Sequence, residues 1–89
     1  MYSFIVNPNA KSGLGQVVWD DLELLLKKSS VQYEVYFTKY QKHATEIVKA
    51  KAKDMDLIVC CGGDGTFNET VSGILETGAD VPVGYIPAG

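Results

Sequence analysis

Short apolar segments alternate along this sequence with longer segments of helical periodicity, and this alternation limits the fold more than any other feature. The short segments are rich in β-branched and aromatic residues, which is typical of strands, and turn residues separate them from the longer segments. They are Tyr2–Val6, Val31–Phe37, Asp56–Cys61 and Val81–Ile86. Asp56–Cys61 is apolar almost throughout, as expected for a central parallel strand covered on both faces.

Three amphipathic helices are predicted between these strands, because apolar residues recur there at intervals of three and four. Their apolar positions are Leu14, Val17, Val18, Leu22, Leu25 and Leu26, then Ala44, Ile47, Val48, Ala52 and Met55, and finally Phe67, Val71, Ile74 and Leu75. Gly78 is expected to end the third helix. Strands and helices in this order predict an α/β fold of three α/β/α layers, Rossmann-like or flavodoxin-like, with a parallel sheet and right-handed crossovers.

Glycine-rich turns follow the first and third strands, and their position predicts the order of strands in the sheet. Ligands of open parallel sheets bind beyond the carboxyl ends of the strands, at the point where the strand order reverses. Two glycine-bearing loops contact one ligand only if their strands are neighbours. We therefore predict the order 2-1-3-4.

Composition limits the other possibilities. The chain of 89 residues fits one small domain, and 46% hydrophobic residues are enough for a core. The net charge is −3 and all eight basic residues are lysines, so nucleic acid is not an expected partner.

Cys60 and Cys61 are adjacent in a strand, so their side chains point to opposite faces and we expect free thiols in a reducing cytoplasm. No signal peptide or membrane span is expected.

The segment Gly62–Thr66 is the strongest candidate for a binding site. A glycine-rich turn from a strand into a helix lets backbone N–H groups point at an anion at the helix N-terminus. Asp64 would face that anion, which makes sense if the carboxylate binds a proton or lies beside a cation. The alternatives are a simple tight turn, or a helix cap formed by Asp64 or Thr66.

The other patterns in the sequence give weaker evidence for a binding or catalytic site. The dinucleotide-binding pattern fails because Val18 stands at its third glycine position, and no glycine-lysine pair forms a P-loop. His43 has no partner at metal-ligand spacing, so we expect it to begin a helix and we predict no metal site from protein side chains. Trp19 and the five tyrosines are expected to pack. Lys11 fits either a solvated loop or a phosphate contact.

Several motifs together resemble the diacylglycerol kinase catalytic domain family, which includes bacterial lipid kinases, sphingosine kinases and ceramide kinases. They are NPNAKSGLG after the first strand, Thr38 after the second with the pair His43-Ala44 beyond it, and GGDGTFNE from Gly62 to Glu69. The closing IPAG is similar to the start of the family's next motif. The resemblance covers essentially all 89 residues, and the pairs Asn7-Pro8 and Asn68-Glu69 favour lipid kinases over NAD kinases.

The resemblance implies ATP-dependent phosphorylation of a lipid hydroxyl, with Mg²⁺ as cofactor and diacylglycerol or a relative as substrate. It implies that residues 1–89 are the nucleotide-binding N-terminal part of the catalytic domain. The family's lipid pocket and further cationic groups belong to a following β-rich domain. From this division we expect the chain alone to bind ATP or ADP weakly without kinase activity, and the complete protein to be cytoplasmic with peripheral membrane contact, a homodimer being one option.

The resemblance also assigns roles to residues. Asn7 and the loop behind it, with Lys11, Ser12 and Gly13, would lie against the nucleotide, and Thr38 would contact phosphate or ribose. The phosphates would lie on the glycine-rich loop, supported by Asn68; that loop is Gly62, Gly63, Asp64, Gly65 and Thr66.

Two points stay open in this assignment. Asp64 matches the general base of sphingosine kinases, whereas bacterial members use an acidic residue of the later domain, so Asp64 is either a base or an electrostatic group beside magnesium. Lys11 and Ser12 also stand where many relatives have glycine sooner after the proline. An NAD kinase-like enzyme and a non-catalytic flavodoxin-like binding module are the alternative functions.

Overall fold

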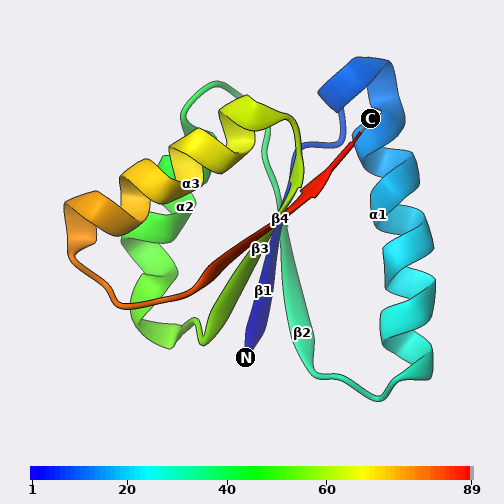
Figure 1. The fold of residues 1–89 in the computed structure, drawn as a ribbon, viewed down its shortest axis with the longest axis horizontal. Coiled ribbons are helices and arrows are strands. Elements are labelled where there is room, and N and C mark those ends of the chain that lie inside the picture. The colour runs from blue at the N-terminus through cyan, green and yellow to red at the C-terminus, as the bar shows by residue number, and fades with distance from the viewer. Residues whose placement is uncertain (89) are drawn as a thin grey trace.

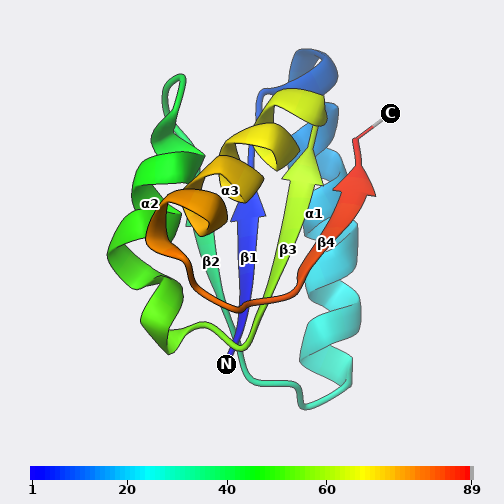
Figure 2. The same ribbon diagram turned by 60° about the vertical axis from the view of Figure 1, so that its left-hand side comes forward.

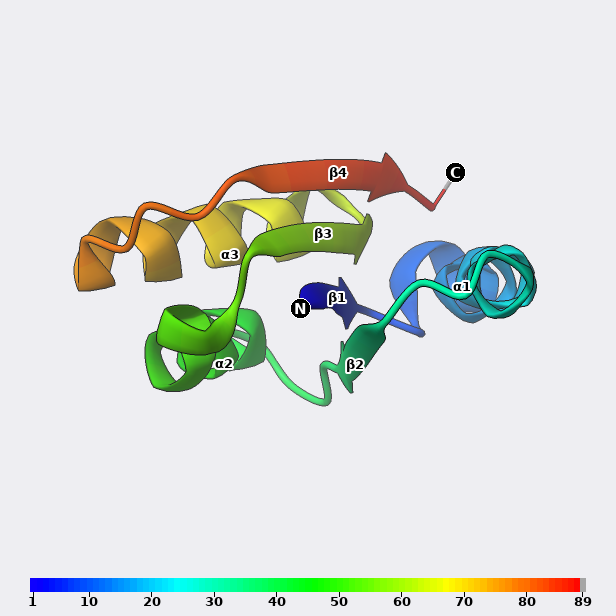
Figure 3. The ribbon, with the colours of Figure 1, turned by 90° about the horizontal axis from the view of Figure 1, so that it is seen from below.

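The computed structural model describes residues 1–88 as a three-layer α/β/α domain. The strands are β1 (Tyr2–Val6), β2 (Tyr33–Phe37), β3 (Leu57–Gly62) and β4 (Val83–Pro87), and the helices are α1 (Ala10–Lys28), α2 (His43–Lys51) and α3 (Asp64–Thr77). A 3₁₀ turn, Ala52–Asp54, extends α2. Figure 1 shows α1 on one side of the sheet and α2 and α3 on the other, and Figure 3 shows the same layers from below. The predicted fold class is confirmed.

All strand pairs are parallel and the sheet order is β2-β1-β3-β4, which confirms the predicted order. In Figure 2 all four arrows point the same way, so the β1–α1, β2–α2 and β3–α3 connections gather at one edge. β2 begins two residues later than predicted, and β3 and β4 are displaced toward the C-terminus by one residue or more. Bounds of this kind depend on strand pairing, which the sequence pattern does not contain.

The face of the sheet under α1 is packed with aromatic rings. The Trp19 side chain is 1% exposed, and its ring lies 5.3 Å from Phe4 and 6.0 Å from Tyr33, measured between centroids. Aromatic pairs at these separations attract each other beyond the burial of area alone. The prediction that Trp19 packs in the core is confirmed.

The apolar rows predicted for α1 and α3 are only partly buried. Leu14, Val17 and Leu25 of α1 are between 46% and 61% exposed, and Leu75 of α3 is 76% exposed. Trp19 takes the central inward position on α1, so part of the predicted row turns to the outside. The buried residues of α3 are instead small ones, among them Thr70 and Gly73. Gly73 packs against α2.

The two cysteines confirm the predicted geometry. Cys60 belongs to the core cluster on the α2 and α3 side, and Cys61 belongs to the cluster on the α1 side. Both thiols are free and buried, and burial raises the pKa of each. No helix among residues 1–88 has both the length and the apolar character needed to cross a bilayer.

Helices α2 and α3 touch at Gly73. A Cβ atom built on Gly73 would lie 2.8 Å from Cβ of Val48 and 3.1 Å from the carbonyl oxygen of Thr45. Neither neighbour has room to retreat, because Val48 is fully buried and the carbonyl is part of the α2 backbone.

We therefore expect Gly73→Ala to push α2 and α3 apart and to lower the free energy of unfolding by about 1 to 3 kcal/mol, the usual effect of overpacking. Urea unfolding followed by circular dichroism measures this loss. Ser72→Ala is the matched control, because Ser72 is exposed on the same helix and should change stability by no more than about 0.5 kcal/mol. Equal stability of Gly73→Ala and the wild type would contradict the tight contact.

Candidate functional site

The ends of β1 and β3 form the centre of the candidate site. The Asn7 N–H donates to the Cys61 carbonyl oxygen at 2.9 Å, so the two backbone segments stay paired one residue beyond the end of β1. A Cβ atom at Gly62 would come within 3.2 Å of both Cβ of Asn7 and Oγ1 of Thr66. Only a glycine fits comfortably between the two loops at this crossing.

A cleft of about 320 Å³ lies on the β2 side of this centre. Residues from the β1–α1 connection, the β2–α2 connection and the start of α3 meet there, and Glu69 of α3 also lines it. Its lining consists of Asn7, Asn9, Thr38, Lys39, Tyr40, Gln41, Gly65, Thr66 and Glu69. The cleft therefore brings together three of the predicted motifs: the asparagine after β1, the threonine after β2 and the end of the glycine-rich loop.

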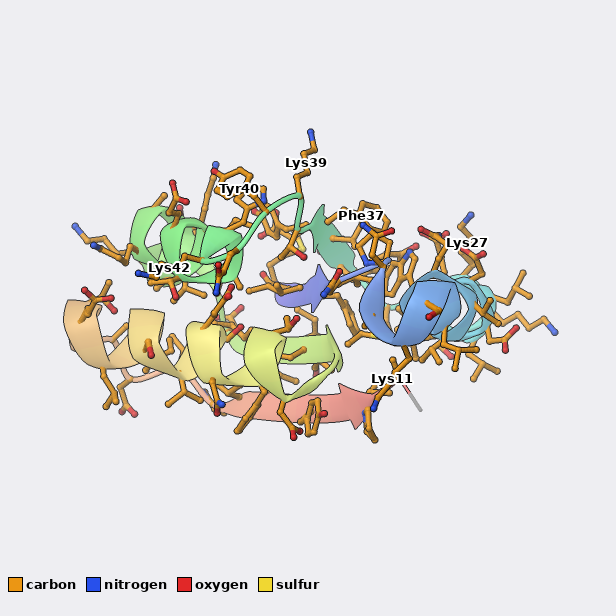
Figure 4. All side chains as sticks on the ribbon, turned by 90° about the horizontal axis from the view of Figure 1, so that it is seen from above. Lys11, Lys27, Phe37, Lys39, Tyr40 and Lys42 are labelled. Carbon is orange, nitrogen blue, oxygen red and sulfur yellow. The ribbon has the colours of Figure 1, made fainter. Side chains whose placement is uncertain are left out.

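A second hollow, of about 300 Å³, lies on the β4 side. It is lined by Lys11, Gly62, Gly63, Asp64, Tyr85, Pro87 and Ala88. Most of the predicted site residues are thus divided between two hollows, with the N-terminus of α3 between them. Figure 4, which looks onto this edge, shows Lys11 beside the end of β4 and Lys39 and Lys42 around the β2–α2 connection.

The first residues of α1 make an unusual turn before the regular part of the helix. Lys11, Ser12 and Gly13 have φ values of 52°, 57° and 99°, in the left-handed region that glycine adopts most easily. Lys11 lines the second hollow, whereas Ser12 and Gly13 line neither of the two. Lys11 and Ser12 therefore adopt a backbone conformation that a glycine would adopt at lower cost.

The glycine-rich loop leads directly into α3. Gly63 is the N-cap residue with extended backbone, and no side chain caps the helix, so neither Asp64 nor Thr66 is a cap. The N–H groups of the first turn have no carbonyl partner within the helix, and the helix dipole adds positive potential there. The start of α3 can therefore accept an anion such as a phosphate group.

Asp64 is exposed in the second hollow and is held by a residue from β4. The Tyr85 hydroxyl donates to Oδ1 of Asp64 at 3.1 Å. Burial raises the pKa of Tyr85, and its hydrogen bond to Asp64 raises it further, so the hydroxyl stays a donor at neutral pH. The second carboxylate oxygen of Asp64 has no protein partner among the described residues and is free for a proton or a cation.

Thr38 is buried at the floor of the first cleft. Its N–H donates to the Val6 carbonyl oxygen at 2.8 Å, and its hydroxyl contacts the same oxygen at 3.4 Å. A hydroxyl with so long a bond can turn to a ligand in the cleft at little cost. Asn68, in contrast, is exposed and lines a groove between α2 and α3 outside both hollows.

Four residues of the site carry contacts that the sequence did not indicate. Tyr85 and Tyr40 were expected to pack, but Tyr85 donates to Asp64, and Tyr40 is exposed at the cleft with its ring stacked on His43 at 4.3 Å. The Nδ1 atom of His43 accepts the Lys39 N–H at 2.9 Å, and a carboxylate oxygen of Glu69 accepts the Lys42 N–H at 2.9 Å. His43 also begins α2, as predicted.

No three histidine, cysteine or carboxylate side chains among residues 1–88 come together as a metal site. Each hollow has one carboxylate, Glu69 in the first and Asp64 in the second. Mg²⁺ commonly binds one or two protein carboxylates and takes its other ligands from substrate phosphates and water. The donor set of the second hollow fits a magnesium ion of that kind.

Comparison with known proteins shows which proteins the chain resembles. The chain is 37% identical to "Sphingosine kinase 1" of Arabidopsis thaliana over 91 aligned residues, which cover 94% of the chain and 19% of that protein. It is 35% identical to "Diacylglycerol kinase" of Staphylococcus haemolyticus (strain JCSC1435), covering 96% of the chain and 26% of that protein. A crystal structure described as a diacylglycerol kinase of Bacillus anthracis str. Sterne superposes with a TM-score of 0.85 at 30% identity, covering 99% of this chain and 31% of that one.

The chain therefore spans between about a fifth and a third of the length of these relatives. The sequence pattern of the diacylglycerol kinase catalytic domain matches residues 1–89, the whole chain. A match of this extent, together with the shared fold, shows that the chain belongs to the diacylglycerol kinase catalytic domain family, a family of lipid kinases.

Proposed function

We propose that this chain forms the nucleotide-binding part of an ATP-dependent lipid kinase that transfers a phosphoryl group to the hydroxyl of diacylglycerol or a related lipid. The observation that carries the proposal is the meeting of Asn7, Thr38 and the start of α3 in one cleft, at the switch point of the sheet. Nucleotides bind at this point in open parallel sheets. Membership of a lipid kinase family supplies the class of acceptor.

The charges at the site support phosphate binding. The free N–H groups of α3 lie between the two hollows, and the ammonium groups of Lys11 and Lys39 lie at opposite sides. Phosphoryl transfer depends mainly on positioning and on neutralising charge at the transferred group. The chain has no arginine, so it offers fewer cationic contacts than the reaction usually needs. We propose that the remainder of the kinase supplies them together with the lipid pocket.

Asp64 is the residue of this chain that we assign to the chemistry. Its free carboxylate oxygen can accept the proton of the attacking hydroxyl, or it can lie beside Mg²⁺ bound to the phosphates. The ion would supply neutralisation of the phosphate charge. Tyr85 orients the carboxylate in either role by occupying the other oxygen. Because lipid substrates reside in membranes, we propose that the complete kinase works at a membrane surface, in the cytoplasm.

A transfer assay tests the proposal. The kinase that carries this chain is incubated with Mg²⁺ and labelled ATP, and with diacylglycerol micelles, sphingosine micelles or NAD as separate acceptors. We expect label in a lipid product and none in NAD, because the family match is to lipid kinases. Label in NAD alone would favour the NAD kinase-like alternative, and no label in any acceptor would contradict a kinase.

The 89-residue chain is assayed in parallel. We expect ADP to shift the amide resonances of Gly62–Thr66 weakly, because the helix-start N–H groups are present, and we expect no transfer to diacylglycerol above a blank without protein. Transfer by this chain would show that it contains the full mechanism. A flavodoxin-like binding module that uses its glycines only for turns would give no nucleotide-dependent shifts.

We expect Asp64→Asn in the kinase to lower turnover by about 10² to 10⁴, the range for loss of a group that takes part in proton transfer. Asp64 is exposed, so the substitution leaves no cavity and the circular dichroism spectrum should not change. The matched control is Asp80→Asn, since Asp80 is an exposed aspartate in the α3–β4 connection at the opposite edge of the sheet. Normal turnover of Asp64→Asn would remove Asp64 from the chemistry.

We expect Tyr85→Phe to have a smaller effect, a decrease in kcat of about 2-fold to 10-fold, because it removes one hydrogen bond and leaves the carboxylate in place. The ring contact of residue 85 with Phe67 at 5.1 Å would remain. Steady-state kinetics at varied ATP separates kcat from KM, and in an Asp64→Asn background Tyr85→Phe should have little further effect. Additive effects of the two substitutions would contradict action through Asp64.

A further inference from the structure

The β2–α2 connection, Thr38–Lys42, has no regular structure, and its residues from Thr38 to Gln41 form one wall of the first cleft. All of it except Thr38 is exposed. Figure 4 shows the side chains of Lys39, Tyr40 and Lys42 projecting from this connection. A short exposed loop of this kind keeps one shape only if specific contacts hold it.

Two side chains hold the backbone of this loop, one at each end. The Lys39 N–H donates to Nδ1 of His43 at 2.9 Å, and the Lys42 N–H donates to Oε2 of Glu69 at 2.9 Å. His43 belongs to the helix that the loop itself enters, so its bond is local. Glu69 is 27 residues away in α3, so its bond is the tertiary one.

The attachment at Glu69 is reinforced by its own backbone. The Thr45 hydroxyl donates to the Glu69 carbonyl oxygen at 2.6 Å, which fixes the first turn of α2 to the same point of α3. Lys42 has φ 71°, a left-handed conformation that a lysine rarely adopts without support. The Glu69 carboxylate thus fixes the loop at its most strained residue.

The charge of Glu69 argues against direct contact with a nucleotide. Its carboxylate lines the cleft in which we place phosphate groups, and like charges at contact distance repel. A hydrogen bond from a backbone N–H gives this carboxylate a structural task instead. Glu69 is half-buried between the cleft and the α2–α3 groove. This position suits a residue that attaches the Thr38–Lys42 loop to α3.

We propose that Glu69 is a positioning residue: its carboxylate fixes the Thr38–Lys42 loop to α3 and so sets the width of the nucleotide cleft. Removing it leaves the start of α3 intact but frees the Lys42 end of the wall, while the Thr38 N–H stays bonded to Val6 and the Lys39 N–H to His43. This inference rests on the proposed function for the identity of the ligand, but the hydrogen bond on which it depends can be measured without any ligand.

The test uses the ¹⁵N-labelled chain as the wild type and as Glu69→Gln, Glu69→Ala and Glu69→Asp. Glutamine keeps an oxygen that accepts the Lys42 N–H, whereas alanine removes the acceptor and aspartate withdraws it by one methylene group. Glu76→Ala is the matched control, because Glu76 is a glutamate of the same helix that contacts α2 through Lys49, 3.8 Å away, and does not contact the loop.

Hydrogen exchange of the Lys42 amide is the first measurement. We expect exchange about tenfold faster in Glu69→Ala and Glu69→Asp, the factor for losing one hydrogen bond of ordinary strength, and wild-type rates in Glu69→Gln and Glu76→Ala. Wild-type protection in both Glu69→Ala and Glu69→Asp would overturn the proposal. Should Glu69→Ala not fold, Glu69→Asp decides.

Titration with ADP is the second measurement. In Glu69→Ala and Glu69→Asp we expect the shifts at Tyr40 and Gln41, next to the freed Lys42, to disappear and those at Gly63–Thr66 to remain, while Glu69→Gln and Glu76→Ala show both sets. Loss of both sets, or retention of both, would overturn the positioning role. Absence of any shift in the wild type would contradict the proposed function, and the exchange rates of Lys42 would then still decide whether Glu69 fixes the loop.

Discussion

The pairing of β1 with β3 is the constraint on which the candidate site depends. These parallel strands carry the two loops that approach each other most closely, with Asn7 bonded to the Cys61 carbonyl and Gly62 leaving no space for a side chain. Moving either strand away by one position in the sheet would separate the loops by about 5 Å, the spacing between neighbouring strands. The chemistry of the edge therefore depends on strand order before it depends on any single side chain.

The site has two sides because α3 begins between them. Groups from β1 and β2 face one side of the helix start, and groups from β4 face the other. A phosphate chain held on the α3 amides would present one end to each hollow. This arrangement separates the residues that can hold a nucleotide, such as Thr38, from the carboxylate of Asp64, which we assign to the reacting end.

Much of this organisation could be predicted from the sequence, because strand and helix periods are local properties. The fold class, the opposite faces of Cys60 and Cys61, and the end of α3 at Gly78 are consequences of short-range patterns. The sheet order was predictable for a different reason, because two glycine-bearing loops that serve one ligand must follow neighbouring strands. The face of α1 that packs on the sheet could not be predicted in this way. Helical spacing alone does not decide whether Trp19 or the leucines near it point toward the sheet. The contacts of Tyr85 and Glu69 join residues 21 and 27 positions apart, and only the packed structure brings them together.

The contact at Gly73 has a mechanical consequence. With Val48 against its Cα, and with the Thr45 hydroxyl bonded one turn earlier, α2 cannot slide or tilt on α3 without breaking close contacts at two levels. The two helices therefore form one rigid unit that packs on the sheet. Any motion that opens or closes the first cleft must then come from the short connection between β2 and α2. The glycine-rich loop forms the wall of the cleft that does not move.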